Sequence, residues 1–232
     1  MLDMASALLE TVEVETGPNV TASIIWMHGL GADGHDFEPA VPHLADRVGQ
    51  SVRFIFPHAP VRPVTINSGM RMRAWYDILG FDRQTRQDES GIRDSAAAIA
   101  ALIRREEVRG IDVARIVLAG FSQGGAMSLY IGARYPQRLA GVIALSCYLP
   151  LAEQFPAERL AANQSTPIFM AHGSMDPVIE ERRGLESREL LTAAGYSVEW
   201  HSYRMAHAVC VEELAAISAF LKRVLAVGSA PA

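Results

Sequence analysis

A serine set between glycines, in the stretch Gly120-Phe121-Ser122-Gln123-Gly124-Gly125, is the residue of this sequence best suited to do chemistry. A serine hydroxyl is a useful nucleophile only when a tight turn exposes it beside a base and beside donors for an oxyanion. An apolar run of strand length precedes Ser122 and a helical pattern follows it, and the flanking glycines permit a tight turn between them. The pattern therefore predicts a nucleophile at Ser122, although an ordinary glycine-rich turn would show the same residues.

Three histidines downstream of Ser122 are candidates for its general base. His201 lies inside the alternating run 198–203 and reads as a sheet residue. His172 closes an apolar strand, whereas His207 falls in the loop after the next strand and just before the last helix. Because the base of an α/β-type serine hydrolase comes last in the chain, on a loop after a strand, we favour His207 over His172.

The acid that orients this histidine should lie one strand earlier. Asp176 sits in a turn broken by Pro177, four residues past the strand that ends at His172. The nearby carboxylates match the solvated face of the next helix, and they are Glu180, Glu181, Glu186 and Glu189. Asp176 is therefore expected to fix the tautomer of His207 and to stabilise its imidazolium.

An oxyanion needs two backbone N–H donors. One is expected from Gln123, the residue after the nucleophile, and the other from Leu30, which lies between two glycines after an early strand. Backbone geometry is expected to matter more than side-chain identity at both positions.

The same early loop, 29–34, matches the glycine pattern of dinucleotide-binding proteins. The next strand, 52–57, ends in proline and is followed by His58 rather than by the acidic residue that would hold a ribose. Pro39 and Pro42 also interrupt the helix that would receive the pyrophosphate. We therefore expect no dinucleotide site in this loop.

A group of His and Asp side chains in this region raises the question of a metal, and its members are His28, Asp33, His35 and Asp36. None of the usual metal-binding spacings is present, and mixed His/Asp loops more often form turn hydrogen bonds. No metal is expected.

Strand-length apolar runs alternate with helical patterns along the whole chain. The predicted strands are 8–15, 22–28, 52–57, 115–120, 139–146, 167–172 and 197–203, and the predicted helices are 36–48, 87–109, 123–134, 180–194 and 209–227. This alternation predicts an α/β fold with a mostly parallel, doubly wound sheet, and the acidic first strand predicts an antiparallel edge. Residues 1–227 are expected to form one domain, and the tail 228–232 is expected to be disordered.

Two long segments, 61–81 and 148–166, interrupt the alternation after strands, where α/β sheets bind ligands. They are too short to build a large cap domain, so the site is expected to be an open groove. Apolar residues near the strand ends are expected to line an acyl channel, and they are Trp75, Ile78, Leu79, Leu149 and Val178. Ordinary core packing is the alternative for these residues.

The bulk properties exclude several classes of protein. Of 232 residues, 50% are apolar and 20% are charged, and the net charge of −5 argues against nucleic acid as a partner. No apolar run approaches the roughly 18 residues of a membrane span, so stable membrane insertion is not expected. The N-terminus lacks a signal-peptide pattern, and Cys147 and Cys210 form no paired motif, which favours a cytoplasmic protein with reduced thiols. The oligomeric state stays open, a homodimer included.

Five segments occur in order along the chain, and they are His28-Gly29-Leu30-Gly31, Ala74-Trp75-Tyr76-Asp77, Gly120-Phe121-Ser122-Gln123-Gly124-Gly125, Leu145-Ser146-Cys147-Tyr148-Leu149-Pro150 and His172-Gly173-Ser174-Met175-Asp176-Pro177-Val178. With these segments the chain resembles the phospholipase/carboxylesterase family of α/β-hydrolases, which includes acyl-protein thioesterases and small bacterial carboxylesterases. The resemblance implies the triad Ser122, Asp176 and His207, with Leu30 and Gln123 as oxyanion donors. It also implies a cofactor-free hydrolase acting on small-molecule esters or acylated substrates, including acyl thioesters or lysophospholipids.

One departure from the family pattern is Ala206-His207-Ala208, where a glycine and a serine usually flank the histidine. If the glycine and serine only ease the turn, activity is expected to be kept. If that serine hydroxyl bonds the imidazole or an acyl group, a modest change in rate or in substrate choice is expected. Two alternatives to an esterase stay open: an amide or C–C hydrolase on the same scaffold, and a binding module that has lost its chemistry.

Overall fold

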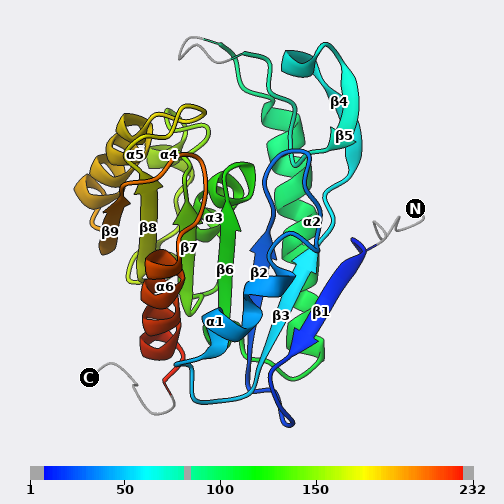
Figure 1. The fold of residues 1–232 in the computed structure, drawn as a ribbon, viewed down its shortest axis with the longest axis vertical. Helices are drawn as coiled ribbons and strands as arrows, with labels where there is room; N and C mark the ends of the chain where they lie inside the picture. Colours follow the sequence, from blue (N-terminus) through cyan, green and yellow to red (C-terminus); the bar gives the residue numbers. More distant parts are fainter. Residues whose placement is uncertain (1–7, 81–84, 227–232) are drawn as a thin grey trace.

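The computed structural model describes residues 8–80 and 85–226, and the predicted disordered tail lies outside these residues. Seven strands form the main sheet, and helices pack around it (Figure 1). The strands are β1 (Thr11–Glu15), β2 (Ala22–Met27), β3 (Val52–Pro57), β6 (Ile116–Phe121), β7 (Gly141–Leu145), β8 (Ile168–Gly173) and β9 (Val198–Tyr203). The α-helices are α1 (Val41–Ala45), α2 (Glu89–Val108), α3 (Gln123–Arg134), α4 (Phe155–Glu158), α5 (Glu181–Ala193) and α6 (Val211–Val224).

The sheet runs in the order β1-β3-β2-β6-β7-β8-β9, and every neighbouring pair except β1–β3 is parallel. The antiparallel edge strand β1 confirms the prediction made from its acidic sequence. β2, β7 and β8 are buried at every position, which fits strands that are covered on both faces.

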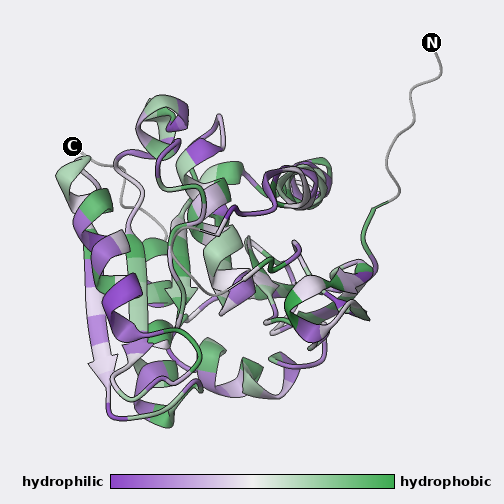
Figure 2. Ribbon diagram, turned by 90° about the horizontal axis from the view of Figure 1, so that it is seen from above, coloured by the Kyte–Doolittle hydropathy of each residue, from purple (hydrophilic) through white to green (hydrophobic). Residues whose placement is uncertain are grey.

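Helices cover both faces of the sheet. α2, α3 and α5 share one apolar core with one face, while α1 and α6 share a second core with the other face. In Figure 2, which looks down on the molecule, the strands in the middle are mostly apolar and the surrounding helices alternate between apolar and polar residues. The two cores hold the sheet rigidly, so the loops at its carboxyl edge have a fixed base.

The chain reverses its direction of winding at β2. From β2 it passes to β3 on one side and later to β6 on the other side, with Met27 of β2 paired to Gly120 of β6. Ligands of open α/β sheets bind in the crevice that forms at such a reversal, at the carboxyl ends of the strands. The loop after Met27 and the turn at Ser122 therefore lie side by side in this crevice.

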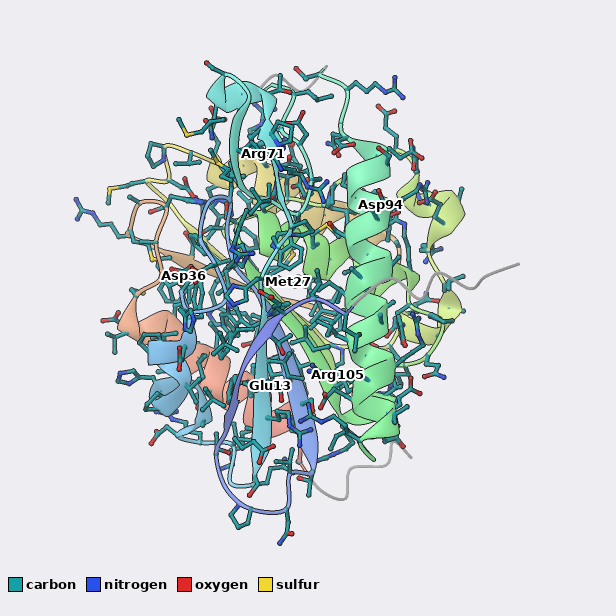
Figure 3. The ribbon with its side chains drawn as sticks, turned by 90° about the vertical axis from the view of Figure 1, so that its right-hand side faces the viewer. Glu13, Met27, Asp36, Arg71, Asp94 and Arg105 are labelled. Carbon is teal, nitrogen blue, oxygen red and sulfur yellow. The ribbon has the colours of Figure 1, made fainter. Side chains whose placement is uncertain are left out.

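Three predicted segments differ in the structure. The segment 148–166 is not irregular throughout, because it contains the short α4 and the 3₁₀ turn Ala161–Asn163. The helix predicted over 36–48 is a 3₁₀ turn, Glu38–Ala40, followed by the short α1, because Pro39 and Pro42 lack the N–H groups of a continuous helix. The segment 61–81 is not irregular throughout: it contains a hairpin of β4 (Val61–Val64) and β5 (Met70–Arg73), joined by the 3₁₀ turn Thr65–Asn67. Figure 3 shows this hairpin, with Arg71, above the end of β2, where Met27 lies.

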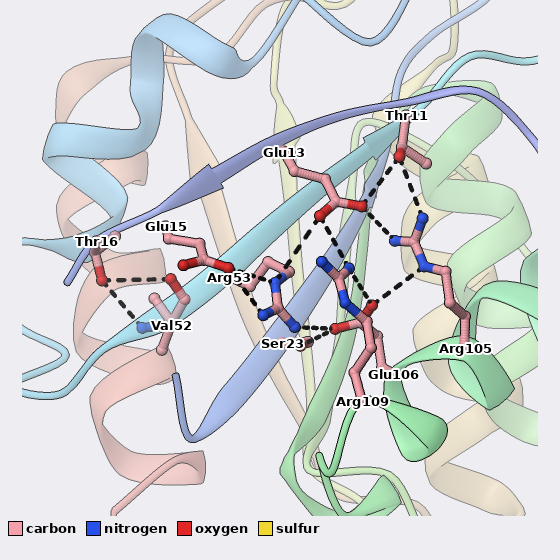
Figure 4. Close-up of polar contacts among 10 residues, drawn as sticks. All are labelled: Thr11, Glu13, Glu15, Thr16, Ser23, Val52, Arg53, Arg105, Glu106 and Arg109. Carbon is pink, nitrogen blue, oxygen red and sulfur yellow. Dashed lines mark hydrogen bonds and ion pairs between the residues drawn. The ribbon is translucent and has the colours of Figure 1, made fainter. Parts of the chain in front are cut away.

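A buried carboxylate ties the edge of the sheet to α2. Glu106 is 0% exposed and accepts hydrogen bonds from Ser23 of β2 at 2.8 Å, from Arg53 of β3 at 2.7 Å and from Arg109 at 3.0 Å (Figure 4). Glu13 of β1 in turn pairs with Arg105 and Arg109. The network thus joins β1, β2 and β3 to α2, with charged groups from β1, β3 and the end of α2.

Candidate active site

Ser122 occupies a strained turn between β6 and α3. Its backbone has φ 55° and ψ −120°, values that non-glycine residues rarely adopt, and its N–H donates to the Leu145 carbonyl at 2.8 Å. A Cβ at Gly120 would come within 2.3 Å of the Gly124 backbone, and one at Gly124 within 2.1 Å of the Met27 carbonyl oxygen. Those two glycines are required because the helix starts in direct contact with the strands.

The predicted triad residues are hydrogen-bonded in series. His207 Nε2 lies 2.9 Å from Ser122 Oγ, and His207 Nδ1 lies 2.7 Å from Asp176 Oδ2. The other Asp176 oxygen accepts the backbone N–H groups of Val178 and Ile179 at 2.8 and 2.9 Å. Because a carboxylate only accepts, His207 Nδ1 carries the proton and Nε2 is left to accept one from Ser122.

The competing histidines are held in other roles. His172 is buried, its Nε2 lies 2.8 Å from the Ile179 carbonyl oxygen, and burial lowers its pKa. His201 stacks on Phe169 and contacts Glu199. Neither is hydrogen-bonded to Ser122, whereas the ring of His207 packs against Phe121 with 4.7 Å between ring centroids. The geometry thus distinguishes His207 from the alternatives.

The two predicted oxyanion donors face the same turn. Gln123 is the first residue of α3, where an N–H has no partner within the helix, and Leu30 lies on the loop that follows β2. Within the described residues, neither backbone N–H donates a hydrogen bond. A Cβ built on Gly29 would lie 3.5 Å from Ser122 Cβ, so the loop is close to the nucleophile.

His28 fixes the start of this loop. Its Nδ1 lies 2.7 Å from the Gly29 carbonyl, which can only accept, and its Nε2 accepts the Ala59 N–H at 3.0 Å. These partners require a neutral ring, and burial lowers the pKa of His28 to about 4. In residues 8–80 and 85–226 no cluster of three or more His, Cys, Asp or Glu side chains is arranged to hold a metal.

The side chain of Gln123 has a role that the sequence analysis missed. Its Oε1 accepts the Trp75 backbone N–H and its Nε2 donates to the Tyr76 carbonyl, both at 2.7 Å. The indole of Trp75 donates to the His28 carbonyl at 2.9 Å. These bonds connect the turn of the predicted nucleophile Ser122, the 75–76 segment and the loop 29–34, the predicted oxyanion loop.

A pocket of about 360 Å³ opens at Ser122, and Leu30, Gln123 and His207 also line it. Of the predicted channel residues, Ile78 and Val178 line this pocket, and Leu79 lines a small adjoining cavity. Trp75 and Leu149 are buried and line neither space. The pocket has further walls that the sequence analysis did not name, among them Ile66, Asn67, Tyr76, Tyr148, Ile179 and Arg183.

None of the helices in the described residues is long and apolar enough to cross a membrane.

The chain was compared with known proteins. Residues 10–225 match the model of the phospholipase/carboxylesterase family. The chain is 45% identical to acyl-protein thioesterase 1 of Neurospora crassa, over 87% of this chain and 86% of the relative. It is 40% identical to acyl-protein thioesterase 1 of Gibberella zeae, over 96% and 98%.

Among solved structures, acyl-protein thioesterase 2 of Zea mays superposes with a TM-score of 0.82 at 28% identity, covering 94% of this chain and 99% of that one. Family, relatives and fold agree with one another. The chain belongs to the phospholipase/carboxylesterase family and is a hydrolase with the α/β-hydrolase fold.

Proposed function

We propose that this hydrolase cleaves carboxylic esters and acyl thioesters through a covalent acyl-enzyme on Ser122. The observation that carries the proposal is the pair of hydrogen bonds that links Ser122 to His207 and His207 to Asp176, at 2.9 and 2.7 Å. A serine with a neutral imidazole at this distance can lose its proton as it attacks a carbonyl.

In the first half of the reaction, Ser122 Oγ attacks the acyl carbon and its proton passes to His207 Nε2. The Asp176 carboxylate stabilises the imidazolium that forms, and the N–H groups of Leu30 and Gln123 hold the tetrahedral oxyanion. The intermediate collapses to the acyl-enzyme, and the alcohol or thiol leaves with the proton from His207.

In the second half, a water molecule gives a proton to His207 and attacks the acyl-enzyme. The second tetrahedral intermediate releases the carboxylic acid and returns the proton to Ser122. Apart from the substrate and this water molecule, no group outside the chain is needed to balance either half, so we propose hydrolysis without a cofactor.

The substrate class is inferred from the pocket and the relatives. Ile66, Ile78 and Val178 give the pocket apolar walls, which favour an acyl chain by about 0.8 kcal/mol per buried methylene. The relatives named above are thioesterases of acylated proteins, and a thioester carbonyl suits the same oxyanion donors. We therefore propose short to medium acyl groups on oxygen or sulfur leaving groups as substrates.

Three substitutions test the roles of the triad: Ser122→Ala, His207→Gln and Asp176→Asn. Each should lower kcat on p-nitrophenyl butyrate and on a butyryl thioester by about 10⁴-fold or more, because the three residues act as one unit. His201→Gln, which changes a histidine not bonded to Ser122, should keep most of the activity. A fluorophosphonate probe should label the wild type at Ser122, and a wild type that is neither labelled nor active would indicate a binding module instead.

A further inference from the structure

The pocket contains a positive charge that the proposed chemistry does not use. Arg183 lines both the 360 Å³ pocket and the adjoining cavity of about 30 Å³, so it lies where the two spaces meet. Of the described residues that line the larger pocket, Arg183 is the only arginine or lysine. The other residues that line both spaces at this junction are Tyr76, Ile78, Gly80 and Tyr148.

The guanidinium of Arg183 is held in a defined position. Its Cζ lies 3.7 Å from the centroid of the Tyr148 ring, in the stacked cation–π arrangement that arginine favours. Stacking covers the flat face of a guanidinium and leaves its N–H edges free to bind a planar carboxylate in a bidentate way. No carboxylate of the described residues lies within 4.0 Å of this guanidinium.

Helix stability does not explain an arginine at this position. Arg183 is in the first turn of α5, where the helix dipole disfavours a cation. The helix dipole also disfavours its neighbour Arg182. However, Arg182 points to solvent with 73% of its side chain exposed, and it pairs with Glu186 at 3.0 Å. Arg183 instead turns toward the pocket, where the helix dipole adds to its attraction for an anion.

We propose that Arg183 is the binding site for a carboxylate at the far end of the acyl group, so that the enzyme prefers ω-carboxylated acyl substrates to neutral ones of equal length. We place the Arg183 junction on the acyl side of the pocket because the leaving group must lie at His207, which gives it a proton. His207 packs on Phe121. The Arg183 junction includes Tyr76, whose backbone is bonded to Gln123 on the oxyanion side. This inference rests on the proposed function.

The test compares matched p-nitrophenyl esters: hexanoate against hydrogen adipate, and octanoate against hydrogen suberate, with the buffer rate subtracted. At the length that reaches Arg183, the wild type should favour the carboxylated ester by about 10- to 100-fold in kcat/KM, through a lower KM. Arg183→Met should remove this preference, so that the neutral and carboxylated esters of equal length have the same kcat/KM. Arg183→Lys should retain part of the preference, and Arg182→Met should retain all of it.

Several results would overturn the inference. The first is an equal kcat/KM for neutral and carboxylated esters at both lengths in the wild type. The second is a preference that survives Arg183→Met. The third is an equal loss of kcat/KM on both ester types in that variant, which would show a packing role alone. If Arg183→Met does not fold, the salt dependence of the wild type tests the inference instead. Raising NaCl from about 0.05 M to about 0.5 M should lower kcat/KM for the carboxylated ester and leave kcat/KM for the neutral ester unchanged. Failure of the proposed function would look different, because hexanoate itself would then not be hydrolysed.

Discussion

At the scale of single residues, Gln123 has a proposed role through its backbone and observed contacts through its side chain. Its N–H is a proposed oxyanion donor, while its amide group binds the Trp75 N–H and the Tyr76 carbonyl at 2.7 Å each. Both partners are buried, so they have no access to water if the amide is lost. The side chain is therefore expected to hold the 75–76 segment, and through Trp75 the oxyanion loop, in register with the nucleophile.

Replacing Gln123 by leucine, which has a similar size, tests this positioning role. The variant should lose about 2–4 kcal/mol of unfolding free energy, because two buried backbone groups become unpaired. It should lower kcat about 10- to 100-fold with a smaller change in KM, since the donor N–H remains but its loop shifts. Ser128→Ala is the matched control: it removes a buried hydrogen bond within the same helix, to the Gly124 carbonyl, without touching residues 75–76. An unchanged kcat in Gln123→Leu would refute the positioning role.

Residue types and chain order were enough to predict which side chains meet at Ser122. The hydrogen bonds of His207 join the predicted residues, because each follows a different parallel strand and those strands end at one edge. The positions of Trp75 and Leu149 were harder to predict, because an apolar residue on a loop gives the same sequence pattern whether its side chain lines a pocket or packs in the core. In the structure both are buried, and Trp75 supports the oxyanion loop instead of lining the channel.

At the scale of elements, the seven strands of the main sheet were all predicted. Inner strands such as β2, β7 and β8 are continuously buried and apolar, while the edge strands β1 and β9 alternate apolar with polar residues. The β4–β5 hairpin was missed. It is a two-stranded ribbon away from the main sheet, largely exposed, and Pro63 within β4 argues against a strand. Its pairing depends on the turn at Ser68 and Gly69, which both have positive φ, and periodicity does not detect such turns.

The loop that follows this hairpin contributes Ile78 to the pocket and Leu79 to the adjoining cavity, and the two residues form a natural pair for substitution. In the wild type, kcat/KM for p-nitrophenyl esters should rise from acetyl to about butyryl or hexanoyl and then level off, as each methylene gains about 0.8 kcal/mol in the pocket. Ile78→Ala should flatten this rise, and Leu79→Ala should change it little. A larger effect from Leu79→Ala would place the acyl chain in the adjoining cavity.

At the scale of the whole molecule, several buried ionisable groups couple stability to pH, and His28 and Glu106 do so in two separate ranges. Burial lowers the pKa of His28 from 6.5 to about 4, so the neutral ring stabilises the fold above pH 6.5. That contribution, about 3 kcal/mol, is lost as the pH falls from 6.5 through 4. For Glu106, burial opposes ionisation, but hydrogen bonds from Arg53 and Ser23 outweigh it and lower the pKa below 4.5.

The contribution of Glu106 is therefore complete above pH 4.5 and lost only as the pH falls through its lowered pKa. Glu106→Gln leaves Arg53 and Arg109 facing a neutral group, and it should cost about 2–4 kcal/mol of unfolding free energy at pH 7. Glu107→Gln is the control, because Glu107 makes no ion pair in the described part of the chain. Urea unfolding of the three proteins between pH 7 and pH 3 should show the same pH dependence in all three from pH 6.5 to 4.5. In that range the loss from His28 is opposed by a gain from Glu213, because burial raises the pKa of Glu213 to about 8. The difference in unfolding free energy between wild type and Glu106→Gln should stay constant through that range and become smaller only below pH 4.5. A gap that narrows already between pH 7 and pH 5 would mean that Glu106 is protonated in the native protein at those values, so that the arginines do not outweigh its burial.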